Sequence, residues 1–208
     1  MHARYKTVLL FGAPGAGKGT QGKILGRIPG FYHLACGDVF RSLDTTSELG
    51  RKFVEFSSRG ELVPDSLTIE MWRQNMHAQT VLSIYKPRVD LLILDGIPRN
   101  VAQAKALDAH IEVLRIIHLV CPDLDRMVER MKRRAIKENR LDDADEKVIR
   151  RRFEVYERET RPVLAHYPDE SVHEVDAMGS PAEVLQHILE VVVPVQNQHF
   201  HNPLVEVG

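Results

Sequence analysis

The chain has 208 residues, a formal net charge of −1 and an apolar fraction of 43%. This length suits one domain with a single substantial core. The nearly neutral charge gives no support to a nucleic-acid binder or a membrane-surface protein, so neither kind of partner is expected. Two cysteines, Cys36 and Cys121, are too few for a disulfide framework or a zinc site, which favours a reducing cytoplasm.

The predicted strands are short apolar runs that alternate with longer helical patterns. Runs without polar alternation are typical of strands buried on both faces, as in a parallel sheet covered by helices. We therefore predict a doubly wound α/β fold, with a five-stranded parallel sheet and helices on both faces. The five runs are YKTVLLF (5–11), FYHLA (31–35), VDLLILD (89–95), LRIIHLVC (114–121) and SVHEVD (171–176).

The first predicted strand leads into GAPGAGKGT (12–20), which nearly fits the phosphate-binding pattern G-x-x-x-x-G-K-[ST]. Gly19 stands where a hydroxyl normally follows the lysine, and Thr20 comes one residue late. The apolar run TVLLFGAPGAG (7–17) is too short for a membrane span or a signal peptide. Between a strand and a helix, the N–H groups of such a loop converge on an anion. We predict a phosphate site, rather than a structural turn, at Gly15, Ala16, Gly17, Lys18, Gly19 and Thr20.

Two later segments interrupt the alternation of strands and helices. From Gly37 to about Met76 the pattern is helical without a strand, which predicts a helical insertion beside the sheet. AIKEN (135–139) is a short polar segment, and both segments are candidates for mobile covers. After Val193 the periodicity is lost, so residues 194–208 are predicted to form a loose tail. We favour an unstructured terminus over a metal site for its His199 and His201.

A second motif, LLILDGIPRN (91–100), carries an acid at the end of a buried strand. Asp95 beside a phosphate loop can hold Mg²⁺ directly or through waters. Gly96 and Pro98 shape a turn that presents Arg99. The alternative is a helix cap with a surface arginine, which the neighbouring phosphate loop makes the weaker interpretation.

The chain resembles the adenylate kinase family of nucleoside monophosphate kinases from Lys6 to about Val193, and a glycine after the loop lysine is normal there. The resemblance implies Mg²⁺-dependent, reversible phosphoryl transfer from ATP to AMP, giving two ADP. It also implies a monophosphate-binding insertion at about 36–65 and a short lid at about 134–141, with no structural zinc. We expect a monomer. The motifs follow the family's order: GAPGAGKGTQ, CGDVFR (36–41), ELVPDSL (61–67), DGIPRNVAQ (95–103) and RLDD (140–143).

Arginines on two predicted helices are candidates for the phosphates. On a helical wheel Arg130 and Arg134 flank an apolar stripe, while Arg133 points nearly opposite. The resemblance gives Arg130 to the face of the ATP base and Arg134 to phosphates, and leaves Arg133 solvated. On the next helix, counting from RLDD gives the family's phosphate arginine as Arg151, whereas the wheel places Arg152 nearer the apolar arc. We favour Arg151.

The resemblance implies that five cations surround the transferring group, because phosphoryl transfer depends on alignment and charge neutralisation. These are Lys18, Arg99, Arg134, Arg140 and Arg151. Backbone near Gly179 should touch the ATP base. The implied monophosphate site comprises Cys36, Arg41, Glu61, Leu62, Val63, Gly96, Ile97, Pro98, Arg99, Gln103, Arg140 and Arg151.

The choice of monophosphate depends on few residues. Gln103 stands where the family reads adenine, and a carboxamide can pair with adenine's adjacent donor and acceptor. Cys36 replaces the usual threonine with a poorer donor, Ile97 replaces an aromatic residue, and Asn100 matches pyrimidine kinases of this fold. We favour AMP, with a UMP/CMP kinase as the alternative. Of other classes, a guanine-nucleotide switch lacks its N-K-x-D motif, whereas a catalytically silent nucleotide-binding protein stays open.

Overall fold

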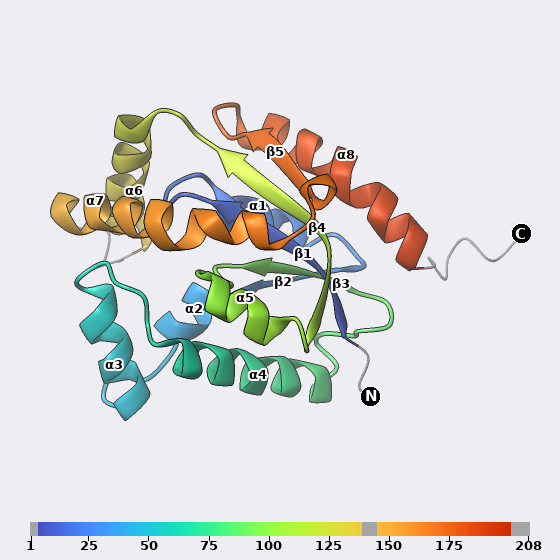
Figure 1. The fold of residues 1–208 in the computed structure, drawn as a ribbon, viewed down its shortest axis with the longest axis horizontal. Coiled ribbons are helices and arrows are strands. Elements are labelled where there is room, and N and C mark those ends of the chain that lie inside the picture. The colour runs from blue at the N-terminus through green and yellow to red at the C-terminus, as the bar shows by residue number, and fades with distance from the viewer. Residues whose placement is uncertain (1–3, 139–144, 201–208) are drawn as a thin grey trace, which may run out of the picture.

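The computed structural model describes residues 4–138 and 145–200. Within them, five parallel strands form one sheet in the order β2-β3-β1-β4-β5 (Figure 1). The predicted five-stranded parallel sheet is therefore confirmed. Its strands are β1 (Tyr5–Gly12), β2 (Phe31–Ala35), β3 (Leu91–Asp95), β4 (Ile111–Val120) and β5 (Val172–Asp176).

Two strands start two or three residues away from the predicted positions, and the remaining differences in strand bounds are of one residue. β3 starts at Leu91, because the Asp90 carboxylate instead accepts a hydrogen bond from the Lys86 N–H at 2.8 Å and closes a turn. β4 starts at Ile111, three residues before the predicted start, and Ile111 pairs with Tyr5 of β1. After the buried Ile111, residues 112–115 are only partly buried. The polar Glu112 therefore breaks the apolar run by which the strand was recognised.

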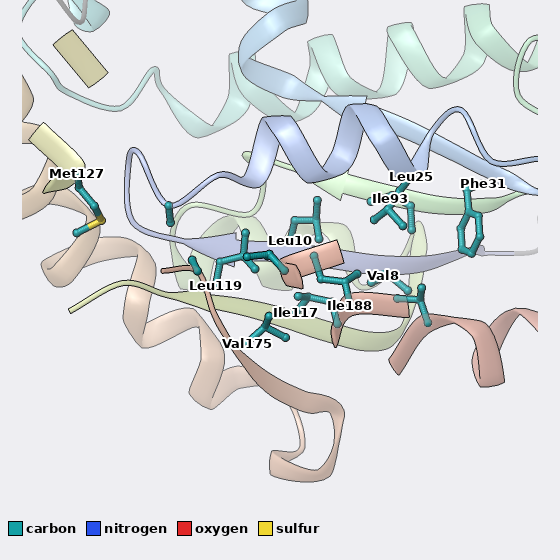
Figure 2. Packing of buried hydrophobic residues seen from close by; sticks show 14 of the residues in the cluster. Val8, Leu10, Leu25, Phe31, Ile93, Ile117, Leu119, Met127, Val175 and Ile188 are labelled. Carbon is teal, nitrogen blue, oxygen red and sulfur yellow. The ribbon is translucent and has the colours of Figure 1, made fainter. Parts of the chain in front are cut away.

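Helices pack on both faces of the sheet. One face is covered by α1 (Lys18–Leu25) and α8 (Pro181–His199). Val8 and Leu10 of β1 point to this face, where they join Leu25 of α1 and Ile188 of α8 (Figure 2). Burial of these apolar side chains is the main stabilising term on this side.

The opposite face carries α4 (Asp65–Val81) and α5 (Val101–Leu107). The alternate residues of β1, Leu9 and Phe11, point here and join Trp72 of α4 and Leu107 of α5 in a second core. Both faces of the central strand are thus buried, as its unbroken apolar sequence requires.

Two groups of helices flank the edge of the sheet at which the strands have their carboxyl ends. The insertion between β2 and β3 consists of α2 (Cys36–Arg41), α3 (Glu48–Ser57) and α4, without a strand. Opposite α3 in Figure 1 lie α6 (Leu124–Glu138) and α7 (Glu146–Val155). After α7 come a π-helical segment, η2 (Tyr156–Thr160), and two 3₁₀ segments, η3 (Arg161–His166) and η4 (Asp169–Ser171).

The predicted loose tail is wrong for residues 194–199, which continue α8 to His199. Pro194 lies inside the helix, but Val195 on the next position is 2% exposed and packs on the first core. Lys6 Nζ also lies 2.9 Å from His199 Nδ1, which ties the helix end to β1. Tertiary packing therefore overrides the helix-breaking proline. Residues 201–208, with His201, lie outside the described part.

None of the helices in the described ranges combines the length and the apolar character needed to cross a membrane.

Candidate active site

A cleft of about 560 Å³ lies where the carboxyl ends of the strands meet the projecting helices. Gly12, Ala35 and Asp95, the last residues of β1, β2 and β3, border it. Ligands of open α/β sheets bind at this edge. The insertion helices form one wall, and residues of α6, α7 and η2 form the other.

The loop after β1 is built to receive an anion. Gly15 and Gly17 have φ values of 84° and 102°, a region that favours glycine. α1 starts at Lys18 without a side-chain cap and without an acidic residue in its first turn. The N–H groups of this turn therefore have neither a capping oxygen nor a nearby carboxylate from the helix itself. Such a helix start is a ready anion site.

Lys18 lies among several charged side chains of the cleft. Its ammonium donates to the Gly12 and Ala13 carbonyls at 2.6 and 3.1 Å. Burial lowers the pKa of Lys18, and the guanidinium groups of Arg99, Arg134 and Arg152 lower it as well. The Asp95 carboxylate acts in the opposite direction, and the resulting pKa is about 8. Charges from β3, α6 and α7 thus act on one ammonium, and phosphates are the anions that such a cluster attracts.

Asp95 provides the acidic group of the cleft. It is 8% exposed and ends β3 beside the start of α1. A Cβ added to Gly19 would lie 3.9 Å from Asp95 Oδ2, so space remains open beside the carboxylate. Among the described residues no group of three or more His, Cys, Asp or Glu could enclose a metal ion. A single carboxylate with free space fits a hydrated Mg²⁺ better than an all-protein cage.

The insertion supplies the other end of the cleft. Arg41 of α2 borders it and pairs with Asp38 at 2.5 Å. The rings of Phe40 and Phe53 stack with centroids 5.3 Å apart, and both border the cleft. Cys36 is 2% exposed and also borders the cleft, and burial raises the pKa of its thiol to about 12. Cys36 is therefore a neutral thiol.

Gln103 on α5 is 1% exposed and borders the cleft. Its Oε1 accepts a hydrogen bond from the Arg99 N–H at 2.8 Å. Its Nε2 donates to Asp65 Oδ1 at 2.7 Å. The side chain is thus held from two sides by residues of the Asp95–Arg99 turn and of the insertion.

The wall formed by α6 carries Arg130 and Arg134, which both border the cleft. Arg130 donates to the Ala177 carbonyl at 3.2 Å, two residues before Gly179, which also borders the cleft. Arg133 pairs with Glu129 at 2.5 Å, and 78% of its side chain is exposed, in keeping with a solvated position, although it reaches the rim.

Two predicted residues do not line the cleft. Ile97 is 2% exposed and packs into the second core, so its replacement of an aromatic residue does not change the cleft wall. Contrary to the prediction, Arg151 is turned outward, where it pairs with Glu154 at 2.9 Å, and its neighbour Arg152 borders the cleft instead. Arg152 lies three residues after the fully buried Ile149, and this spacing brings it to the inner face of α7.

The cleft does gather the other predicted residues that the structure describes. Arg140 lies outside the described ranges. The residues gathered are Gly15, Ala16, Gly17, Lys18, Gly19, Thr20, Cys36, Arg41, Glu61, Leu62, Val63, Asp95, Gly96, Pro98, Arg99, Gln103, Arg130, Arg134 and Gly179.

Among the cleft residues that the sequence analysis missed are Gln21, Tyr156 and Thr160. Gln21 is 3% exposed, and its Nε2 donates to the Pro181 carbonyl at 2.9 Å. Its place directly after GKGT was the only signal for it. Thr160 donates to the Arg99 carbonyl at 2.8 Å, and Tyr156 contacts His118 Nε2 at 3.0 Å. Nothing in the local sequence of η2 indicates either contact.

A glycine loop at the end of a parallel strand, with a lysine, an aspartate and converging arginines, defines a P-loop phosphotransferase. The family model "Adenylate kinase" matches residues 10–172. The adenylate kinase of Flavobacterium psychrophilum is 35% identical over 196 residues, covering 89% of this chain and 97% of the relative. The adenylate kinases of Kocuria rhizophila and Thermus thermophilus are 37% and 36% identical over 188 and 190 residues. Each alignment covers 88% of this chain, and 96% and 95% of the respective relatives.

The chain belongs to the adenylate kinase family. It is an enzyme of the nucleoside monophosphate kinase class, as the sequence motifs predicted.

Proposed function

We propose that the enzyme transfers the terminal phosphoryl group of ATP to AMP, reversibly, to give two ADP. Gln103 carries this proposal, because it is buried to 1% exposure and borders the cleft at the insertion. A carboxamide there can pair with the amino group and the ring nitrogen of adenine. The relatives named above, all adenylate kinases, support the same acceptor.

The chain's residues act by alignment and charge neutralisation. The loop N–H groups and Lys18 bind the terminal phosphates of ATP, and Arg130 and Gly179 hold its base. Arg41 binds the monophosphate. Negative charge from two nucleotides meets between them, and removing one preorganised donor from such a site lowers kcat by roughly 10²–10³-fold. Packing of the walls around both nucleotides excludes water, which would otherwise accept the phosphoryl group.

We assign to Arg152 the phosphate-binding role that the sequence had given to Arg151. Arg152 borders the cleft, and its charge acts on Lys18. With Arg99 and Arg134 it would neutralise the transferring group from separate elements. Arg140 keeps its predicted role as a proposal.

Mg²⁺ is part of the proposal. Asp95 would hold it mainly through waters, next to the space that Gly19 leaves open. When bound, the ion supplies further neutralisation of the terminal phosphates. The free thiols of Cys36 and Cys121 support a reducing cytoplasm as the compartment. A monomer stays our expectation for the catalytic unit.

The test is ADP formation from ATP with AMP, UMP, CMP and dAMP in parallel. We expect AMP to be the best acceptor. Turnover of UMP or CMP well above that of AMP would instead assign the enzyme to the pyrimidine kinases. Its Asn100 matches those kinases at this position.

A second measurement separates a kinase from a silent nucleotide-binding protein. Lys18→Ala and Arg99→Ala should each lower turnover by about 10²-fold or more. Residual activity equal in wild type and both variants would come from a contaminating kinase. Tight ATP binding by a wild type without turnover would support the silent protein.

A further inference from the structure

Asp65 contacts Gln103, the side chain proposed to read the base, but does not itself line the cleft. Asp65 is the first residue of α4, and its Oδ1 accepts a hydrogen bond from Gln103 Nε2 at 2.7 Å. On the other side, Gln103 Oε1 accepts from the Arg99 N–H at 2.8 Å. Gln103 is thus connected both to the insertion and to the turn that carries Arg99.

These two neighbours require the same orientation of the carboxamide. An ionised carboxylate only accepts hydrogen bonds, and a backbone N–H only donates them. Nε2 must therefore face Asp65, and Oε1 must face Arg99. A flip of the carboxamide by 180° would lose both bonds and set like groups against each other in a buried site.

Asn100 strengthens the same arrangement. Its Oδ1 accepts from the Gln103 N–H at 2.8 Å and caps α5, and its Nδ2 donates to Asp65 Oδ1 at 2.9 Å. Asp65 therefore holds two amide side chains of one helix start. This contact accounts for Asn100, which does not border the cleft.

The fixed orientation has a consequence for the base. A carboxamide has two N–H donors and two acceptor lone pairs, and its two neighbours take one of each. One donor and one acceptor remain, in a set order. A 6-aminopurine offers an N–H donor next to a ring acceptor, whereas a 6-oxopurine offers an acceptor next to a ring N–H. A carboxamide that could flip would accept either base, but a fixed one accepts only one of them.

We propose that Asp65 is a positioning residue that fixes the Gln103 carboxamide and thereby makes the monophosphate site select a 6-amino over a 6-oxo purine. The inference rests on the proposed function, in which AMP is the acceptor. Asp65 acts through Gln103 and does not touch the base.

The experiment compares kcat/KM for AMP and inosine monophosphate, which differ only in the group at C6 and the attached ring proton. Asp65→Asn keeps the size of the side chain but can either donate to or accept from Gln103, so only the Arg99 N–H still favours one orientation of the carboxamide. It should lower the AMP-to-inosine-monophosphate ratio about tenfold, the scale of one misplaced base-reading pair, and leave the KM for ATP unchanged. The matched control is Glu70→Gln, which removes an acid of the same helix that contacts Arg73 and Gln74. It should leave the ratio unchanged.

A double-mutant cycle with Gln103→Ala separates positioning from a general structural effect. Once Gln103 is truncated, Asp65→Asn should have no further effect on the ratio. An unchanged ratio in Asp65→Asn, or an equal effect with and without Gln103, would overturn the proposal. Asp65→Ser, which can also donate, replaces Asp65→Asn if the latter does not fold. Failure of the wild type to use AMP would instead overturn the proposed function.

Discussion

The guanidinium of Arg152 lies close enough to Lys18 for its positive charge to lower the pKa of the Lys18 ammonium. The adjacent residue, Arg151, is turned to the surface, where its Nη1 lies 2.9 Å from Glu154. Two consecutive arginines of α7 therefore have different environments, and only one of them faces the cleft.

This difference gives a prediction with an internal control. Arg152→Ala should lower kcat by about 10²–10³-fold, because it removes a positive charge that faces the phosphates. Arg151→Ala should change kcat less than about twofold, since exposed ion pairs contribute little. Steady-state kinetics with saturating ATP and AMP tests both. The reverse order of effects would restore the role that the sequence gave to Arg151.

The strands could be predicted from sequence because strands buried on both faces have unbroken apolar runs, which are local patterns. β2 (Phe31–Ala35) has the predicted bounds, and β4 was misplaced by three residues at its start and by one at its end. Arg151 was chosen by counting from RLDD, although the helical wheel pointed to Arg152. The wheel was the better guide, because it reports which side of α7 packs inward around Ile149 and Phe153.

The contact between Gln103 and Asp65 could not be predicted in the same way. The two residues are 38 positions apart, and both of their local motifs are explained by helix starts. Their hydrogen bond depends on how the insertion packs against α5. No periodicity or spacing within either segment encodes that packing.

The lowered pKa of Lys18 predicts a pH dependence of ATP capture. The ammonium must be charged to bind phosphates, and in the free enzyme its pKa is about 8 instead of the ordinary 10.5. The kcat/KM for ATP should therefore fall as pH rises above about 8, approaching tenfold per pH unit. Bound phosphates favour the charged form, so kcat at saturating ATP should stay level to a higher pH.

Lys18→Arg is the control for this profile. Its guanidinium stays charged over the whole range, so the pH dependence above about 8 should disappear, whatever the level of activity. A wild-type kcat/KM that stays flat to pH ~10 would show that Lys18 keeps an ordinary pKa.

A substitution at Gly19 should lower the activity of the enzyme without lowering its stability. Its added Cβ would meet only Asp95 Oδ2, at 3.9 Å, so Gly19→Ala should leave the free energy of unfolding unchanged or raise it by up to about 1 kcal/mol. The methyl group would nevertheless occupy the space beside Asp95. We expect about tenfold lower kcat and a higher Mg²⁺ requirement, on the scale of a misplaced catalytic group.

Gly26→Ala, at the end of the same helix, should instead lower the stability of the fold. There the new Cβ would lie 2.7 Å from the Cβ of His33, which cannot move without the strand that carries it. Overpacking of this kind costs about 1–3 kcal/mol. Thermal unfolding and kcat of both variants would check the pair, and a destabilised but fully active Gly19→Ala would contradict the metal position.

The thiol of Cys36 offers the last test of the acceptor site. It is 2% exposed and borders the cleft, and burial holds its pKa near 12, so it meets a nucleotide as a neutral and weak donor. Cys36→Thr replaces it with a hydroxyl, which is a stronger donor. A net hydrogen bond contributes about 1 kcal/mol, so the KM for AMP should fall by about three- to fivefold. Cys36→Val has nearly the same shape without a donor and controls for packing. The KM should fall for threonine and stay level or rise for valine. An equal change in both variants would mean that residue 36 affects the site through its volume and not through hydrogen bonding to the base.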